Sequence, residues 1–324
     1  MPLQSGLGIR PTFEKVSKQT FYSNGKLLIT GEYLVLDGAK ALALPTKFGQ
    51  DLSVSEGKNN HIYWKSFDAD GSIWFEDTIS FDQIQALRIP DNIDSIKNTL
   101  VNILREANKL NPQLTAAGGY EIETRLTFPK YWGLGTSSTL INNIAQWLEI
   151  DAFLLLKNSF GGSGYDIACA QSDSPIFYQL VNEIPSVVKV DFEPAFADHL
   201  YFVYLNRKQS SKAAIASYYN NRSVDLQDYI ERIGRITEKI VAAENIGVFA
   251  RELEKHESLI SDIVQMNTVK DAFFSDFEDG VIKSLGGWGG DFVLAVSVEN
   301  PTSYFSSRGF TTVIPYREMI LTQQ

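Results

Sequence analysis

The sequence contains little of what several functional classes require. It has a single cysteine, Cys169, so an intramolecular disulfide is excluded and a reducing compartment, the cytoplasm, is expected. The three histidines, His61, His199 and His256, are scattered, and no two of them have the spacing of zinc ligands. No apolar run is long enough to cross a bilayer, and the first 18 residues lack the apolar core of a signal peptide.

Positive charge is also scarce. Lys and Arg number 29 against 39 Asp and Glu, which gives a formal net charge of −10. This balance argues against nucleic acid or an anionic membrane as the main partner, but not against a small anionic metabolite, because a binding site depends on local charge. A Walker loop is absent, since Leu27 follows Lys26 where that motif needs a hydroxyl. The sequence leaves a homodimer open.

Residues 129–138, Pro-Lys-Tyr-Trp-Gly-Leu-Gly-Thr-Ser-Ser, have the composition of a phosphate-binding loop. Gly133 and Gly135 allow a tight turn, and three hydroxyl residues stand where a helix would begin. Apolar residues at helical spacing predict that helix over 136–149. The free amides and positive dipole at its start suit an anion. An ordinary capped helix after a glycine turn fits the segment equally well.

Strands and helices follow one another without strict alternation, which indicates an α+β fold. We expect strands at 26–30, 33–36, 120–128, 187–192, 201–205, 291–298 and 309–316, an antiparallel meander across 51–76, and helices over 93–110, 151–158, 211–219, 224–243, 247–265 and 269–284. A boundary near residue 195 would place the active site between two parts.

Three further blocks occur in a fixed order with the glycine-rich segment: residues 23–38, residues 161–168 (Gly-Gly-Ser-Gly-Tyr-Asp-Ile-Ala) and residues 285–292. Together the four blocks resemble the motifs of the GHMP kinases, the family named for galactokinase, homoserine kinase, mevalonate kinase and phosphomevalonate kinase. The resemblance implies a two-domain α+β architecture. An N-terminal extension over 1–20 would precede a mixed α/β ATP-binding domain over 21–195 and a ferredoxin-like α+β domain over 196–324.

Asp166 follows a glycine-rich turn, and the residue pattern leaves two roles open. It could cap the helix that begins at Ile167, or accept a proton from a substrate hydroxyl. The resemblance implies the second role and makes Lys26 its cationic neighbour, which would keep Asp166 ionised and attract the γ-phosphate. The chain departs from the family pattern at Asn24, which replaces a proline, and at Tyr33, where many mevalonate kinases have histidine.

The resemblance also implies which residues bind the nucleotide and its Mg²⁺. Ser138 would contact the metal, but the family's glutamate on the helix ahead of the catalytic aspartate has no counterpart, because residues 152–165 contain no acid. The nearest acids are Glu149 and Asp151, so the acidic ligand stays open, and magnesium often keeps several waters. The expected ATP-binding residues are Gly133, Leu134, Gly135, Thr136, Ser137 and Ser138.

Substrate contacts are expected from several of the blocks. The segment 207–213 is basic and rich in hydroxyls, so it could bind an anion or be a solvated helix start. Trp288 interrupts a motif of small residues, which leaves the role of that turn open. The expected substrate residues are Glu32, Tyr33, Ser163, Gly164, Lys208, Ser211 and Gly287.

The resemblance implies transfer of the ATP γ-phosphate to a small anionic alcohol. Mevalonate is favoured slightly over phosphomevalonate, because an intact base suits an alcohol acceptor. A related decarboxylase of diphosphomevalonate and a silent ligand-binding relative are the alternatives from other classes.

Overall fold

The structure is a computed structural model that describes residues 18–86, 95–207, 218–219 and 226–322. The first part of the chain, to residue 189, forms β1 (Gln19–Leu28), η1 (Leu34–Asp37), β2 (Ala41–Glu56), β3 (His61–Phe67), β4 (Ile73–Ser80), α1 (Phe81–Gln85), α2 (Ile96–Leu110), η2 (Pro112–Thr115), β5 (Tyr120–Leu126), α3 (Thr136–Leu148), α4 (Ala152–Ser159), α5 (Tyr165–Ala170), β6 (Ile176–Val181) and β7 (Ile184–Lys189). The remainder forms η3 (Ala197–His199), β8 (Leu200–Tyr204), α7 (Leu226–Val241), α8 (Ile246–Val264), α9 (Val269–Phe273), β9 (Gly280–Leu285), β10 (Phe292–Ser297), α10 (Thr302–Ser307), β11 (Val313–Pro315) and α11 (Tyr316–Met319).

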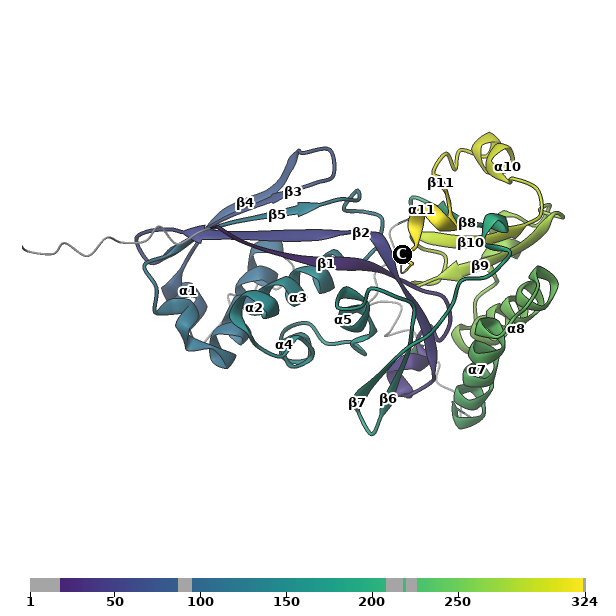
Figure 1. The fold of residues 1–324 in the computed structure, drawn as a ribbon, viewed down its shortest axis with the longest axis horizontal. Helices are drawn as coiled ribbons and strands as arrows, with labels where there is room; N and C mark the ends of the chain where they lie inside the picture. The colour runs from purple at the N-terminus through teal and green to yellow at the C-terminus, as the bar shows by residue number, and fades with distance from the viewer. Residues whose placement is uncertain (1–17, 87–94, 208–217, 220–225, 323–324) are drawn as a thin grey trace, which may run out of the picture.

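A seven-stranded sheet organises the first part of the chain. Its strands run in the order β4-β3-β5-β2-β6-β7, and β1 pairs with the long strand β2. Helices α1 to α5 lie on one side of this sheet (Figure 1). The alternating residues of β5 explain this layering, because Ile122, Thr124 and Leu126 are buried while Glu121 and Arg125 are exposed.

A four-stranded antiparallel sheet, in the order β11-β8-β10-β9, organises the second part. Its strand β10 is buried on both faces, which explains its continuous apolar sequence. Leu294 belongs to the core cluster formed with α7 and α8, whereas Val293 and Ala295 belong to the cluster formed with Phe274 and Phe305.

The structure bears out the predicted α+β class and corrects three local predictions. Residues 33–36 are not a strand, because positive φ angles at Gly31 (87°) and Tyr33 (61°) turn the chain into η1. The helix over 269–284 is wrong, since α9 ends at Phe273 and residues 280–285 form β9, paired with β10. The meander is also wrong in part, because β5 lies between β2 and β3 and runs parallel to β3.

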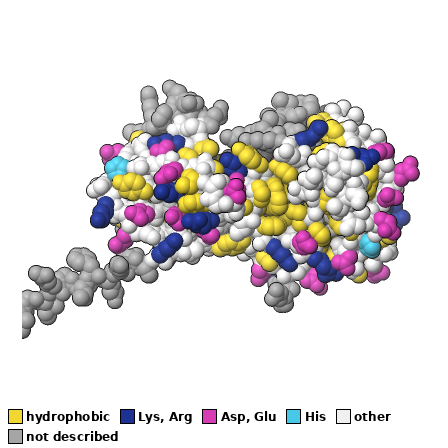
Figure 2. Space-filling model, turned by 90° about the horizontal axis from the view of Figure 1, so that it is seen from above, with side chains coloured by type: hydrophobic (Ala, Val, Ile, Leu, Met, Phe, Trp, Pro, Cys, Tyr) yellow, Lys and Arg dark blue, Asp and Glu magenta, His cyan; other side chains and the backbone are white. Residues whose placement is uncertain are grey.

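The two sheets share a hydrophobic core. One cluster of buried residues includes Leu27 and Phe128 from the first part and Phe202, Leu253 and Leu294 from the second. The chain end also returns to the first sheet, where the amide of Leu321 donates to the carbonyl of Pro45 (3.0 Å). Figure 2 shows hydrophobic side chains gathered in the middle of one face, between the two lobes. The domain boundary at residue 195 stays a prediction.

Candidate active site

The glycine-rich segment forms a tight turn that leads directly into α3. Gly133 and Gly135 have left-handed φ angles of 68° and 98°, which side chains rarely adopt. Gly135 is the N-cap of α3, and no side chain caps the helix. Ser138 is buried and donates to the Gly135 carbonyl (2.9 Å), whereas Thr136 is half-buried and Ser137 is exposed. The first-turn amides therefore have no capping side chain, as an anion site requires.

Buried polar side chains hold this helix start against the sheet. Thr139 donates to Gln50 Oε1 (2.8 Å), and Asn143 donates through Nδ2 to the Gln50 carbonyl (2.9 Å). Ser23 in turn donates to Asn143 Oδ1 (2.7 Å). Sequence reasoning missed this network, because its members lie far apart in the chain. It fixes the position of α3 relative to β1 and β2.

Lys26 and Asp166 meet beside the glycine turn. The backbone amide of Lys26 donates to the Leu134 carbonyl (3.0 Å), which ties β1 to the turn. Lys26 Nζ lies 3.5 Å from Asp166 Oδ1, and both side chains are partly exposed, at 16% and 29%. Asp166 stands in the first turn of α5, whose N-cap is Gly164, and does not cap it. Its buried Oδ1 has no hydrogen-bond partner among the described residues.

The surroundings keep Lys26 positively charged. Burial alone would lower the pKa of its ammonium, but Tyr165, Asp166 and Asp291 reverse that effect and the pKa is raised. Burial, together with Asp166, raises the pKa of the Tyr165 phenol, which therefore stays protonated. Lys26 Nζ also lies 5.4 Å from the centroid of the Tyr165 ring. The site thus pairs the Lys26 ammonium with the Asp166 carboxylate, which can still accept a hydrogen bond.

Tyr178 and Phe153 pack against the glycine turn that precedes Asp166. Tyr178 donates its hydroxyl to the carbonyl of the buried Ser163. A Cβ at Gly164 would lie 3.0 Å from Phe153 and 3.1 Å from the Tyr178 hydroxyl, so the chain passes close to both rings. These contacts set the direction in which α5 presents Asp166.

Glu32 lies in a buried cluster of ionisable groups. Lys283 Nζ forms an ion pair with Glu32, donates to the Ser284 carbonyl (2.7 Å) and lies 3.9 Å from Glu257 Oε2. His256 Nε2 accepts the Gly31 amide (2.9 Å). Burial, reinforced by Lys283, lowers the pKa of His256 well below its ordinary value, so this ring is neutral. No local pattern indicates this cluster, which joins the turn between β1 and η1 to α8 and β9.

Tyr33 and the later glycine motif contact each other. The Tyr33 hydroxyl accepts the backbone amide of Trp288 (2.8 Å), and its ring stacks on Tyr218 at 5.7 Å. Trp288 is buried and donates through Nε1 to the Asn267 carbonyl (2.9 Å). Gly287 accepts the Gly290 amide (2.9 Å) within the same turn. Trp288 therefore anchors the turn that carries Gly287.

The buried carboxyl of Glu257 predicts a pH dependence of stability. Burial, with a contribution from Glu32, raises its pKa from an ordinary value near 4.5 to about 7. The folded state then binds this proton more tightly than the unfolded state, so the free energy of unfolding should fall by up to roughly 3 kcal/mol as pH rises from 4.5 to 7. The depressed pKa of His256 acts oppositely, because stability is lost as pH falls below about 6.5.

Glu257→Gln isolates the first contribution, because the amide does not titrate while His256 is unchanged. Urea unfolding of both proteins between pH 5 and 8 should show the stability of the variant, relative to wild type, rising with pH. A constant difference across that range would show that Glu257 does not titrate between these limits.

The expected nucleotide and catalytic residues converge, whereas others lie apart. Lys208 and Ser211 lie outside the described residues. Glu149 is at the C-cap of α3, roughly 20 Å of helix away from the glycine turn, and Asp151 caps α4 through the amides of Phe153 and Leu154.

The oxygens near the glycine turn suit Mg²⁺. The Ser138 hydroxyl and the Asp166 carboxylate are hard oxygen donors of the kind that this ion prefers, although Asp166 Oδ1 already faces Lys26 Nζ at 3.5 Å. Within the described ranges, no group of three or more His, Cys, Asp or Glu side chains could hold a metal. Phosphate oxygens and water would therefore have to supply the other ligands.

No helix in the described ranges is long and apolar enough to span a membrane.

Among known proteins, only solved structures are similar to this chain. No protein-family model and no curated protein sequence matches the chain. The mevalonate kinase of Methanococcus jannaschii superposes with a TM-score of 0.68 at 14% identity, covering 96% of this chain and 100% of that one. A Streptococcus pneumoniae phosphomevalonate kinase, in complex with phosphomevalonate and AMPPNP, gives 0.63 at 15% identity and covers 94% and 98%.

A third solved structure has a similar fold. The galactokinase of Lactococcus lactis, complexed with galactose, superposes with a TM-score of 0.61 at 11% identity, covering 93% of this chain and 95% of that one. All three similarities span nearly the full length of both chains. The chain therefore has the two-domain α+β fold of the GHMP kinases, as its sequence motifs predicted.

Proposed function

We propose that this protein is an ATP-dependent kinase that phosphorylates a small anionic alcohol. The observation that carries the proposal is the Lys26–Asp166 pair beside the uncapped start of α3. That arrangement sets an anion-binding helix end, a fixed cation and a candidate proton acceptor next to one another. Phosphoryl transfer needs these parts, because its catalysis consists largely of positioning and of neutralising phosphate charge.

In this proposal, each part has one task. The amides of α3 and its hydroxyl residues bind the phosphates, and Lys26 stabilises charge on the transferred group. Asp166 accepts the proton of the acceptor hydroxyl as the oxygen attacks phosphorus. Ser138, phosphate oxygens and water would hold Mg²⁺, which when bound would neutralise phosphate charge. The protonated phenol of Tyr165 belongs to the same site, since its ring centroid lies 5.4 Å from Lys26 Nζ.

Mevalonate is our first candidate acceptor. A hydroxyl acceptor benefits from a nearby base, and Asp166 Oδ1, which pairs with Lys26 but accepts no hydrogen bond from the described residues, can take that proton. Phosphomevalonate is second. Its support is that α4 (Ala152–Ser159) carries no acidic residue, and that residues 31–37 resemble the first motif of phosphomevalonate kinases.

The test is ATP consumption with Mg²⁺ against mevalonate, phosphomevalonate, diphosphomevalonate, homoserine and galactose, with product masses recorded. A mass gain of one phosphoryl group on one acceptor would support the kinase and name its substrate. Release of carbon dioxide from diphosphomevalonate would identify a decarboxylase instead. ATP binding without turnover on any acceptor would favour a silent relative.

A further inference from the structure

Residues 131–135, which we call the phosphate loop, directly precede α3 and carry the glycine turn. Gly133 and Gly135 have left-handed φ angles of 68° and 98°. Because glycine leaves the backbone freer than any other residue does, contacts from outside the loop must fix the direction in which it presents the first amides of α3. One such contact comes from β1, where the Lys26 amide donates to the Leu134 carbonyl (3.0 Å).

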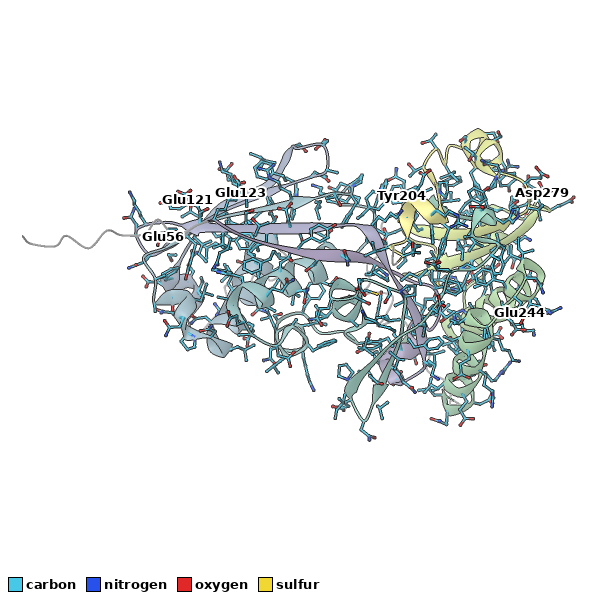
Figure 3. The ribbon with its side chains drawn as sticks, viewed as in Figure 1. Glu56, Glu121, Glu123, Tyr204, Glu244 and Asp279 are labelled. Atoms are coloured by element: carbon cyan, nitrogen blue, oxygen red, sulfur yellow. The ribbon has the colours of Figure 1, made fainter. Side chains whose placement is uncertain are left out.

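Tyr204 of the second sheet contacts the other end of the phosphate loop. It is the last residue of β8 and pairs with Phe292 of β10. Figure 3 places it where the second sheet approaches the first. Its hydroxyl donates to the Tyr131 carbonyl (2.9 Å), two residues before Gly133. Burial, reinforced by Asp291, raises the pKa of this phenol, so it stays protonated and remains a donor.

The next two residues of the loop also pack against the second sheet. The ring centroids of Trp132 and Phe292 lie 5.6 Å apart, edge to face, and those of Trp132 and Tyr204 lie 6.2 Å apart. The Asp291 side chain fills the space that a Cβ on Gly133 would occupy. The second sheet therefore contacts three consecutive residues of the phosphate loop.

Of these contacts, the hydrogen bond from Tyr204 is the directional one. Packed rings tolerate small shifts, whereas a hydrogen bond weakens steeply as its angle departs from linear. Tyr204 itself is fixed, because its amide donates to the Thr312 carbonyl (3.0 Å) and its ring packs on Phe292 with centroids 5.2 Å apart. A group carried by a strand holds its geometry more precisely than one carried by a loop.

We propose that the Tyr204 hydroxyl positions the phosphate loop for the nucleotide, so that phosphate binding at the start of α3 depends on the second sheet. Tyr204 is a positioning residue, because it acts through the Tyr131 carbonyl. A loop held in its binding conformation costs less to order when the ligand arrives, and this increases affinity. The inference rests on the proposed kinase function.

The test compares the affinity of AMPPNP, with Mg²⁺, for wild type, Tyr204→Phe and Tyr201→Phe by calorimetry, and urea unfolding verifies that each protein folds. Tyr201 is the matched control, because it lies on the same strand and its hydroxyl also donates to a backbone carbonyl, that of Asp198 (2.9 Å). Both variants keep the ring and lose one hydrogen bond. Tyr204→Phe should bind AMPPNP about three- to tenfold more weakly than wild type, the usual worth of one hydrogen bond. Tyr201→Phe should bind it as wild type does.

Steady-state kinetics on the acceptor that the substrate test identifies adds a second readout. In Tyr204→Phe the KM for ATP should rise by the same factor while kcat stays close to wild type, because a loosely held loop weakens ground-state and transition-state binding equally. Equal AMPPNP affinity of all three proteins would overturn the inference. Equal losses in both variants would overturn it too, since they would show a general effect of removing a hydroxyl from β8. Failure of the wild type to bind AMPPNP would overturn the proposed function itself, and the inference with it.

Discussion

Replacing Asp166 by asparagine is expected to lower kcat on the preferred acceptor by about 10²–10⁴-fold, the usual contribution of a positioned general base. The amide keeps the size of the side chain but cannot take the hydroxyl proton. It also leaves Lys26 without the carboxylate that lies 3.5 Å from its ammonium in the wild type. Nucleotide affinity should change little, because the α3 amides and hydroxyls that would bind the phosphates remain.

The measurement is steady-state turnover together with calorimetric binding of AMPPNP. Asp173→Asn is the matched control, since Asp173 lies three residues beyond α5 and forms an exposed ion pair with Lys189. Turnover of the control should stay close to wild type. Undiminished turnover of Asp166→Asn would contradict the base assignment, and an effect below tenfold would favour a phosphate acceptor, which is already an anion.

Lys26→Met, alone and combined with Asp166→Asn, tests whether the two side chains act together. If Lys26 and Asp166 act as one unit, the double variant should lose little more activity than the worse single variant. Independent roles would instead give losses that multiply. Comparing the two single variants with the double variant therefore shows whether Lys26 only attracts phosphate or also keeps Asp166 ionised.

The parts of the site that could be predicted are those encoded in contiguous residues. Gly133, Gly135 and the hydroxyls that follow them form a turn and a helix start within ten residues, so local pattern was enough. Asp166 could be placed at a turn for the same reason, although the residues alone left its cap and base roles open. The structure brings it to Lys26, which lies 140 positions earlier in the numbering.

Contacts between distant segments could not be predicted in this way. The Glu32–Lys283 pair spans 251 positions, and nothing in either local sequence indicates the other. Helical period was a poor guide over 269–284, because only Val269 of α9 is buried, whereas every residue of β9 after Gly280 is buried. Tyr33 adopts a positive φ that a tyrosine rarely takes, so the strand expected over 33–36 could not be excluded beforehand.

Lys283→Met is expected to destabilise the protein by about 3–5 kcal/mol, because it leaves Glu32 as a buried carboxylate without its cation. Lys283 is 0% exposed and Glu32 is 2% exposed, so water cannot replace the lost partner. His256 cannot replace it either, since burial keeps that ring neutral and its Nε2 accepts the Gly31 amide. Urea unfolding at pH 8 measures the loss.

Lys65→Met on β3 is the matched control. Lys65 and its partner Glu76 form an exposed ion pair (3.1 Å), so removing this lysine should cost no more than about 1 kcal/mol. If both methionine variants lose the same small amount, the buried pair does not hold the two parts of the chain together.

The double variant Glu32→Gln/Lys283→Met decides what the pair contributes. Removing both charges eliminates the uncompensated carboxylate, so much of the stability lost in the single variant should return. Full recovery with intact AMPPNP binding would mean that the charges stabilise only each other. Recovery of stability without nucleotide binding would mean that Glu32 and Lys283 set the distance between β1, which carries Lys26, and β9, which leads to the turn of Trp288 and Asp291. In that case the buried pair would position both sides of the proposed phosphate site, although neither side chain reaches the nucleotide.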